Sequence, residues 1–322
     1  MLMNFKLLMF SSLVAMGAIF SLSSNNWVSM WIGMEISMMS FLPMMSSKLK
    51  LSSESCIKYY IVQSLSSSIM MMGIIMMSLN IKSELILMSS LLMKLGMMPF
   101  HNWVLSIIEG MTHTNIILMF TILKLAPLNM ISFLEMNLQF LVVLSLVVSS
   151  MSALNQNSLK KIMTYSSIYN LSIILSSISS WSIWMTFMTI YSISTAVIMM
   201  MFKNMNFNFI NQIMTLNNSM AMKIEMLMAI LSMAGMPPAS MFMMKMMIME
   251  SLIMSKEYLI ISTIILTSTI TMFFYMRISI MVMTIYHTTS KWMPVSKNQS
   301  MATMILLLSL IFPTLLYLKS FM

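Results

Sequence analysis

Charged side chains are too scarce in this chain for a water-soluble fold. The 322 residues include eight Asp or Glu and 17 Lys or Arg, so 8% are charged, whereas 59% are hydrophobic. A soluble globular domain carries about 25% charged residues. A soluble protein of this length would need far more polar surface. We therefore expect lipid to be the solvent for most of the surface.

The apolar residues form stretches of the length that crosses a bilayer. A membrane-spanning helix takes about 20 mainly apolar residues, and polar clusters, prolines and glycines divide the chain into eleven such stretches. They are too long and too uniformly apolar for the alternating strands of a β-barrel. The sequence predicts an all-α polytopic membrane bundle, one transmembrane domain over 1–322, with spans at 5–23, 26–45, 56–79, 84–108, 113–132, 138–154, 160–179, 181–202, 224–250, 258–285 and 301–319.

The regions outside these spans leave little room for other functions. Long connections are expected only around 203–223 and 287–300, and no glycine-rich phosphate loop occurs. We therefore expect no extramembrane domain, no nucleotide-binding fold and no nucleic-acid partner.

Residues that usually hold a metal or redox centre are rare. A single cysteine excludes a disulfide framework, a cysteine-based zinc site and a thiolate-held iron–sulfur cluster. Three histidines, at 101, 113 and 287, are too scattered for a haem or copper pair. The 53 methionines run through nearly every apolar stretch, which favours flexible apolar filler over a copper(I) surface. We expect no cofactor and no metal on this chain.

The lysines predict how the chain is oriented. An odd number of spans puts the two termini on opposite sides of the membrane. Nine lysines fall on the amino-terminal side and three on the carboxyl-terminal side. Because the side with more lysines faces inward, the positive-inside rule places the amino terminus in the cytoplasm or matrix. The first stretch is long enough to span and is expected to be a retained helix rather than a signal peptide. The nine lysines on the amino-terminal side are Lys6, Lys48, Lys50, Lys160, Lys161, Lys203, Lys223, Lys291 and Lys297.

Four charged residues lie in the middle of predicted spans. They are Glu35, Lys94, Lys124 and Lys245, each several residues from the nearest span end. Charge inside the hydrocarbon is costly and usually faces protein or water along an ion pathway. Snorkelling to the interface works best near a helix end. These four residues are the predicted proton path.

Other polar residues near span ends have less specific interpretations. Lys58, Lys160, Lys161 and Arg277 are expected to anchor helices at the interface. Glu109 and Glu250 are accessory candidates for loading or releasing an ion. His101 has two interpretations: a ring bonded to a neighbouring backbone or hydroxyl group, or a proton relay.

Two lysine-bearing stretches are also interrupted by glycine and proline. Lys94 is followed by Gly96 and Pro99, within 83–132, and Gly235 and Pro237-Pro238 precede Lys245, within 223–256. Proline removes a helix donor and frees carbonyl groups that can hold water or an ion. Paired broken helices in two halves of a transporter indicate an inverted repeat with a central site.

Lysine suits proton transfer inside a membrane. Burial disfavours the charged ammonium, while a nearby carboxylate favours it. A neighbour that approaches or withdraws can therefore make lysine hold or release a proton.

Five motifs occur along the chain in this order: Trp31–Glu35, Lys94–Trp103, Lys124–Pro127, Leu154–Ser167 and Gly235–Pro238 followed by Lys245. Together they resemble the chain-2 family of mitochondrial NADH:ubiquinone oxidoreductase, respiratory complex I, one of its antiporter-like subunits. The resemblance covers roughly residues 27–250, and the methionine-rich, arginine-poor composition resembles arthropod mitochondrial products.

The resemblance implies a proton-translocating subunit of an inner-membrane enzyme. It implies that Glu35 pairs with Lys94 in one half-channel, that Lys124 connects centrally and that Lys245 opens the exit half. NADH, FMN, iron–sulfur clusters and ubiquinone would belong to other subunits. Implied partners are the neighbouring antiporter-like subunit, small core subunits and lipids such as cardiolipin.

One stretch departs from the family pattern. Tyr169 and Asn170 stand where the family often has Asn-His, and Ser172 stands where glycine is usual. The link from Lys124 to Lys245 is therefore expected to use serine, tyrosine and water in place of histidine. The accessory candidates there are Tyr165, Ser166 and Ser167.

Two alternatives stay open. A stand-alone or Mrp-like cation/proton antiporter belongs to the same family, although the chain has no acidic pair in a broken helix, and hard cations prefer oxygen ligands. The other alternative is a structural membrane scaffold whose lysines are relics. Replacing Lys94, Lys124 or Lys245 with methionine and measuring proton pumping distinguishes these two alternatives from the proton-translocating subunit.

Overall fold

The protein is all-α in the part of the chain that its structure describes. The computed structural model describes residues 5–47, 50–134, 136–213, 220–237 and 239–284. Within these ranges the regular elements are helices, and one isolated bridge joins Ser158 to Phe209. The chain divides into two compact units, residues 1–141 and 142–322. The single transmembrane domain stays a prediction.

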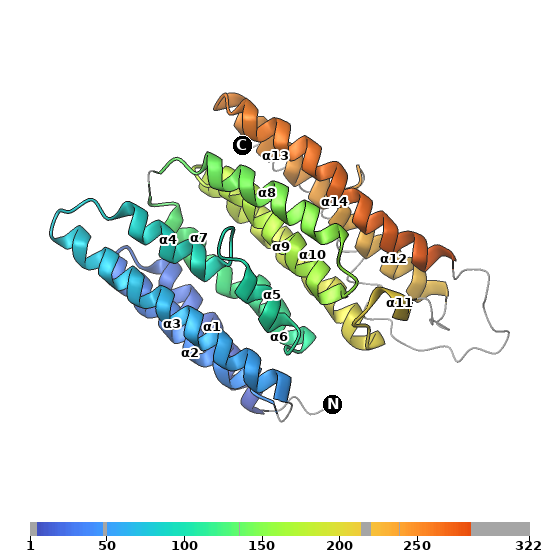
Figure 1. Cartoon of the computed structure of the whole chain (residues 1–322), viewed down its shortest axis with the longest axis horizontal. Helices are drawn as coiled ribbons and strands as arrows, with labels where there is room; N and C mark the ends of the chain where they lie inside the picture. The colour runs from blue at the N-terminus through green and yellow to red at the C-terminus, as the bar shows by residue number, and fades with distance from the viewer. Residues whose placement is uncertain (1–4, 48–49, 135, 214–219, 238, 285–322) are drawn as a thin grey trace. The chain divides into compact units, whose positions relative to one another are not determined.

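The first unit is built from antiparallel neighbours. α1 packs along α2, α2 packs on α3, and α7 contacts α1, α2 and α4. These helices run from blue to blue-green in Figure 1. Their bounds are α1 (Phe5–Ser23), α2 (Trp27–Met45), α3 (Lys50–Ser78), α4 (Glu84–Leu95), α5 (Asn102–Ile108), α6 (His113–Phe120) and α7 (Ile122–Ile131), and α8 (Gln139–Leu154) begins at the end of the unit.

The second unit surrounds a polar helix. Every residue of α9 from Ile162 to Leu175 is buried, although this stretch contains serine, tyrosine and asparagine side chains. α10, α13 and α14 contact α9, and α12 packs on α10, α13 and α14. The bounds are α9 (Leu159–Ser176), α10 (Trp181–Met205), α11 (Ile210–Ile213), α12 (Met220–Ala234), α13 (Ser240–Met254) and α14 (Tyr258–Thr284), from green to orange in Figure 1.

The helices follow the predicted spans closely. Two spans differ at their ends: the helix expected from 56 begins at Lys50, and the helices of the span expected at 224–250 begin at Met220 and end at Met254. Glu54 and Lys58 form an ion pair one turn apart at 2.6 Å on the exposed first part of α3. The span predicted at 301–319 lies outside the described residues. By length and composition, six described segments can cross a membrane: Phe5–Ser23, Trp27–Met45, Lys50–Ser78, His113–Ile131, Trp181–Met205 and Tyr258–Met283.

Both predicted helix breaks are present and have the same backbone pattern. α4 ends before Gly96 and α12 ends before Gly235, with φ angles of 69° and 80°. At each break the glycine N–H bonds a carbonyl three residues back, and the next N–H, from Met97 or Met236, bonds a carbonyl five residues back. Glycine adopts this left-handed conformation at low cost, so it ends both helices. Pro238 lies outside the described residues.

A third interruption was not predicted. The span at 113–132 is divided into α6 and α7 at Thr121, whose φ and ψ angles are −111° and −84°. The Ile117 carbonyl accepts both the Thr121 N–H at 3.1 Å and the Thr121 hydroxyl at 2.8 Å. This break lies just before Lys124.

Arg277, which was predicted to anchor a helix at the interface, binds backbone carbonyls at the end of another helix. From α14 it donates to the carbonyls of Leu154 and Gln156, both at 3.0 Å. The last carbonyls of a helix lack partners within the helix and carry its negative dipole end. Arg277 therefore caps the carboxyl end of α8.

Glycines bring α1 and α2 into backbone contact. A Cβ atom added at Gly17 would lie 2.8 Å from the Gly33 carbonyl oxygen and 2.8 Å from the Ser37 nitrogen. Small residues spaced four apart permit such close helix packing in membranes. The contact fixes the position of α2, the helix that carries Glu35.

We expect Gly17→Ala to separate α1 from α2 and to destabilise the protein by about 1–3 kcal/mol, the usual cost of overpacking. Thermal unfolding of the assembled protein in detergent measures the change. Ser12→Ala, at a position near the α1 surface, is the control. An unchanged unfolding midpoint for Gly17→Ala would contradict the close packing.

Candidate functional site

Glu35 and Lys94 form an ion pair inside the first unit. The Lys94 Nζ lies 3.1 Å from the Glu35 Oε1, and the exposed fractions of the two side chains are 4% and 19%. α2 supplies the glutamate and the last turn of α4 supplies the lysine. The pairing implied by the family resemblance is therefore present as a contact. A buried ammonium is stabilised by such a partner.

The backbone at the first break is held by side chains from two other helices. Trp103 of α5 donates its indole N–H to the Met93 carbonyl at 3.1 Å. Gln63 of α3 donates its amide to the Lys94 carbonyl at 3.4 Å. Both carbonyls belong to the final turn of α4, where helical partners run out. These bonds fix the end of α4 and with it the base of the Lys94 side chain.

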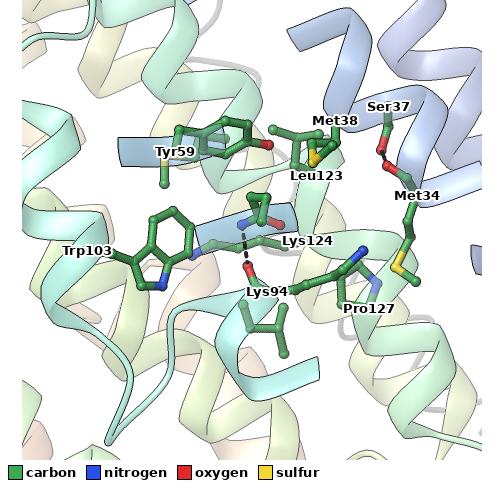
Figure 2. A pocket seen from close by; sticks show the side chains of 12 residues that line it. Met34, Ser37, Met38, Tyr59, Lys94, Trp103, Leu123, Lys124 and Pro127 are labelled. Atoms are coloured by element: carbon green, nitrogen blue, oxygen red, sulfur yellow. Dashed lines mark hydrogen bonds between the residues drawn. The ribbon is translucent and has the colours of Figure 1, made fainter. Parts of the chain in front are cut away.

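Lys94 and Lys124 line one small cavity. Lys124 comes from α7, is 5% exposed, and its Nζ lies 5.1 Å from the centre of the Phe120 ring. The cavity has a volume of about 30 Å³. Figure 2 shows its wall, which includes Tyr59 and Ser37. A polar cavity needs about 10–15 Å³ of this kind of volume for one water, so it can hold roughly one or two waters between the lysines.

Lys245 lies at the second break, within the second unit. It is 6% exposed and comes from α13. A Cβ atom added at Gly235 would lie 3.2 Å from the Lys245 Nζ, so the ammonium packs against the end of α12. The Nζ also lies 5.4 Å from the centre of the Tyr169 ring. Both a helix carboxyl end and an aromatic face favour a cation.

A pocket opens beside Lys245. Its volume is about 210 Å³. The wall combines the α12–α13 break with one side of α14, including the hydroxyl-bearing residues Ser268 and Thr269. The Lys245 side chain therefore lines a pocket that is formed entirely within the second unit.

The accessory candidates have different positions. His101 is partly exposed and its Nδ1 lies 3.3 Å from the Pro99 carbonyl oxygen, as the backbone-bonded interpretation expects. Glu109 and Glu250 are exposed near the ends of α5 and α13. Tyr165, Ser166 and Ser167 are buried in α9. Their roles in proton transfer stay predictions.

Sequence reasoning missed several polar residues of the two units. Tyr59 and Gln63 line the cavity next to Lys94. Tyr191 of α10 and Tyr275 of α14 are buried in the second unit. Their common signal is a polar side chain inside an apolar stretch. A search restricted to charged residues could not find them.

Comparison with known proteins identifies the family. Residues 24–271 match the family model described as NADH:quinone oxidoreductase/Mrp antiporter, TM. NADH-ubiquinone oxidoreductase chain 2 of Locusta migratoria is 34% identical over 96% of this chain and 94% of its own length. The chain belongs to the NADH-ubiquinone oxidoreductase chain 2 family. The Bos taurus member is 30% identical over 89% of this chain and 87% of its own length.

Solved structures show that this chain has the fold of antiporter-like membrane subunits. A chain of respiratory complex I from Thermus thermophilus matches with a TM-score of 0.85 at 16% identity, over 97% of this chain and 78% of that chain. A chain of the Mrp complex from Dietzia matches with a TM-score of 0.72 at 12% identity, over 91% and 62% of the two chains. The predicted all-α membrane fold is confirmed.

Proposed function

We propose that this chain is a membrane-arm subunit of proton-translocating NADH:ubiquinone oxidoreductase. Protons would cross the inner mitochondrial membrane through a buried path of glutamate, lysine and water. Electron transfer from NADH to ubiquinone in other subunits would drive them. The observation that carries this proposal is the cavity shared by Lys94 and Lys124, with Glu35 bound to one of the two lysines.

The shared cavity lets one lysine affect the charge on the other. In a site of low dielectric, two ammonium groups repel far more than they do in water. The Glu35 carboxylate favours the charged form of Lys94, so withdrawal of Glu35 would release a proton into the cavity. Lys124 would take up that proton through the one or two waters the cavity accommodates.

Lys245 would serve the second unit in the same way. The end of α12 and the Tyr169 ring would stabilise its ammonium, and water in the adjoining pocket would accept its proton. Movement at the break between α12 and α13 would weaken the contact with the end of α12. Lys245 would then lose its proton to the pocket.

The family and the distribution of lysines support a proposal for the membrane, the orientation and the partners of this chain. It would lie in the inner mitochondrial membrane with its amino terminus in the matrix, as the lysine distribution predicts. Its partners would be the neighbouring antiporter-like subunit, small core subunits and lipids such as cardiolipin. NADH, FMN, iron–sulfur clusters and ubiquinone would be bound by other subunits, and this chain would hold no redox centre.

Replacing Lys124 with methionine tests the proposal. Methionine keeps much of the length of the side chain but cannot carry a proton, so we expect fewer protons moved per NADH oxidised. Proton uptake into vesicles and NADH oxidation are measured together on the assembled complex. Lys82→Met, at an exposed loop position, is the control. Normal pumping by Lys124→Met would refute the path through this cavity.

A further inference from the structure

Three tyrosine hydroxyl groups are buried in the second unit without a protein partner. They belong to Tyr169 of α9, Tyr191 of α10 and Tyr275 of α14, and none makes a hydrogen bond within the described residues. Their side chains are at most 3% exposed. Buried polar groups almost always have a partner, which is either protein or ordered water. Three such groups in one unit point to bound water.

The three hydroxyls lie close to polar side chains of α9 or of one another. The Tyr275 hydroxyl lies near the Ser166 side chain, and the Tyr191 hydroxyl lies near Ser167 and Tyr275, although none of these pairs has the geometry of a direct hydrogen bond. Ser166 and Tyr169 are three residues apart, so they lie on one face of the helix. We call Tyr169, Tyr191 and Tyr275 the tyrosine cluster.

The neighbouring hydroxyls are oriented to accept a hydrogen bond. Ser166 donates its hydrogen to the Met163 carbonyl at 2.9 Å. Thr267 and Thr271 of α14, which lie near the Tyr169 hydroxyl, donate to the carbonyls of Thr263 and Ser268 at 2.6 and 2.9 Å. A hydroxyl that donates its only hydrogen keeps its lone pairs. The surroundings therefore offer acceptors to tyrosine or water O–H groups.

Lys245, the proposed proton carrier of the second unit, lies next to the tyrosine cluster. Its Nζ lies 5.4 Å from the centre of the Tyr169 ring. Water hydrogen-bonded to the Tyr169 hydroxyl would extend the path from Lys245 along α9.

We infer that the tyrosine cluster binds water and relays protons to and from Lys245, an inference that rests on the proposed function. The Lys245 ammonium gives its proton to an adjoining water. Each phenol oxygen accepts the excess proton from a protonated water on one side and gives up its own proton to a water on the other, which carries the excess proton onward. One O–H bond forms as another breaks, so no net charge remains on the tyrosine. The hydroxyl then rotates back before the next transfer.

Phenylalanine substitutions test the relay. Tyr169→Phe, Tyr191→Phe and Tyr275→Phe remove one oxygen each and keep the ring. We expect each to slow proton translocation roughly tenfold or more at equal NADH oxidation, because positioned proton-transfer groups contribute about 10²–10⁴-fold. Assembly should be unchanged, since losing a hydroxyl that has no protein partner carries little structural cost. Tyr258→Phe, on the same helix as Tyr275 but 66% exposed, is the control.

The possible outcomes separate this inference from the proposed function. Normal pumping by all three phenylalanine variants, with pumping lost in Lys245→Met, would overturn the relay alone. Normal pumping by Lys245→Met as well would overturn the role of Lys245 in the proposed function. A high-resolution map of the complex with no water density beside the three phenol oxygens would also overturn the relay.

Discussion

Lys94→Met is expected to lower both the stability of the assembled complex and its proton pumping. The substitution leaves the Glu35 carboxylate without the ammonium that now lies 3.1 Å away. Breaking a buried ion pair by removing one partner costs about 3–5 kcal/mol. We expect the lower part of this range, because Glu35 is 19% exposed and water can reach it in part. The thermal midpoint of the purified complex measures the loss.

A double variant separates the structural effect from the functional effect. Glu35→Gln with Lys94→Met removes both charges, so no unpaired carboxylate remains and much of the stability should return. Proton pumping should stay low, because no titrating group is left at this position. A double variant that pumps normally would exclude the pair from the proton path. A stable Lys94→Met single variant would show that the pair contributes little to folding.

Gly96→Ala is expected to have the second large effect. An added Cβ atom would overlap the Val104 Cγ2, and the φ angle of 69° is unfavourable for alanine. The left-handed conformation costs about 1–2 kcal/mol and overpacking about 1–3 kcal/mol more. Because Lys94 lies two residues before the glycine, relief of the clash should also move its ammonium away from Glu35. Thermal unfolding and proton pumping on the same preparation measure both effects.

Val104→Ala and Gly235→Ala are matched controls for this prediction. Combining Val104→Ala with Gly96→Ala removes the clashing methyl group, so the backbone cost and a tight approach of the added Cβ to the Trp103 ring, at 3.2 Å, should remain. At Gly235 the nearest atom is the flexible end of Lys245, 3.2 Å from an added Cβ. Gly235→Ala should therefore cost less stability than Gly96→Ala and chiefly displace Lys245. Equal stability losses at both glycines would show that the Val104 contact is unimportant.

The helical elements could be predicted because each depends on local sequence. Long apolar stretches bounded by polar residues predicted α1 and α2 to within one residue, and glycine followed by proline predicted the breaks after α4 and α12. The interruption at Thr121 was missed, since a threonine inside an apolar stretch is compatible with a continuous helix. Its hydroxyl bond to the Ile117 carbonyl is visible only in the structure.

The candidate site could be predicted only in part. A charged residue in the middle of an apolar stretch stands out whatever its neighbours are, so Glu35, Lys94, Lys124 and Lys245 were recognisable. The family resemblance, rather than spacing, implied the contact between Glu35 and Lys94, which lie 59 positions apart. Tyrosine is ordinary in a membrane helix, so nothing in the sequence distinguished Tyr191 or Tyr275 from other aromatic residues.

The sequence by itself determined that this protein is a helical membrane bundle with four charges at mid-depth, because the cost of placing charge or unpaired backbone in lipid depends on residue type and run length. Tertiary structure decided which groups act together. It brought Lys94 and Lys124 to one cavity and left the hydroxyls of the tyrosine cluster buried without protein partners. Hydrogen bonds and ion pairs form over a few ångströms between helices that are distant in the chain, and only their packing sets those distances.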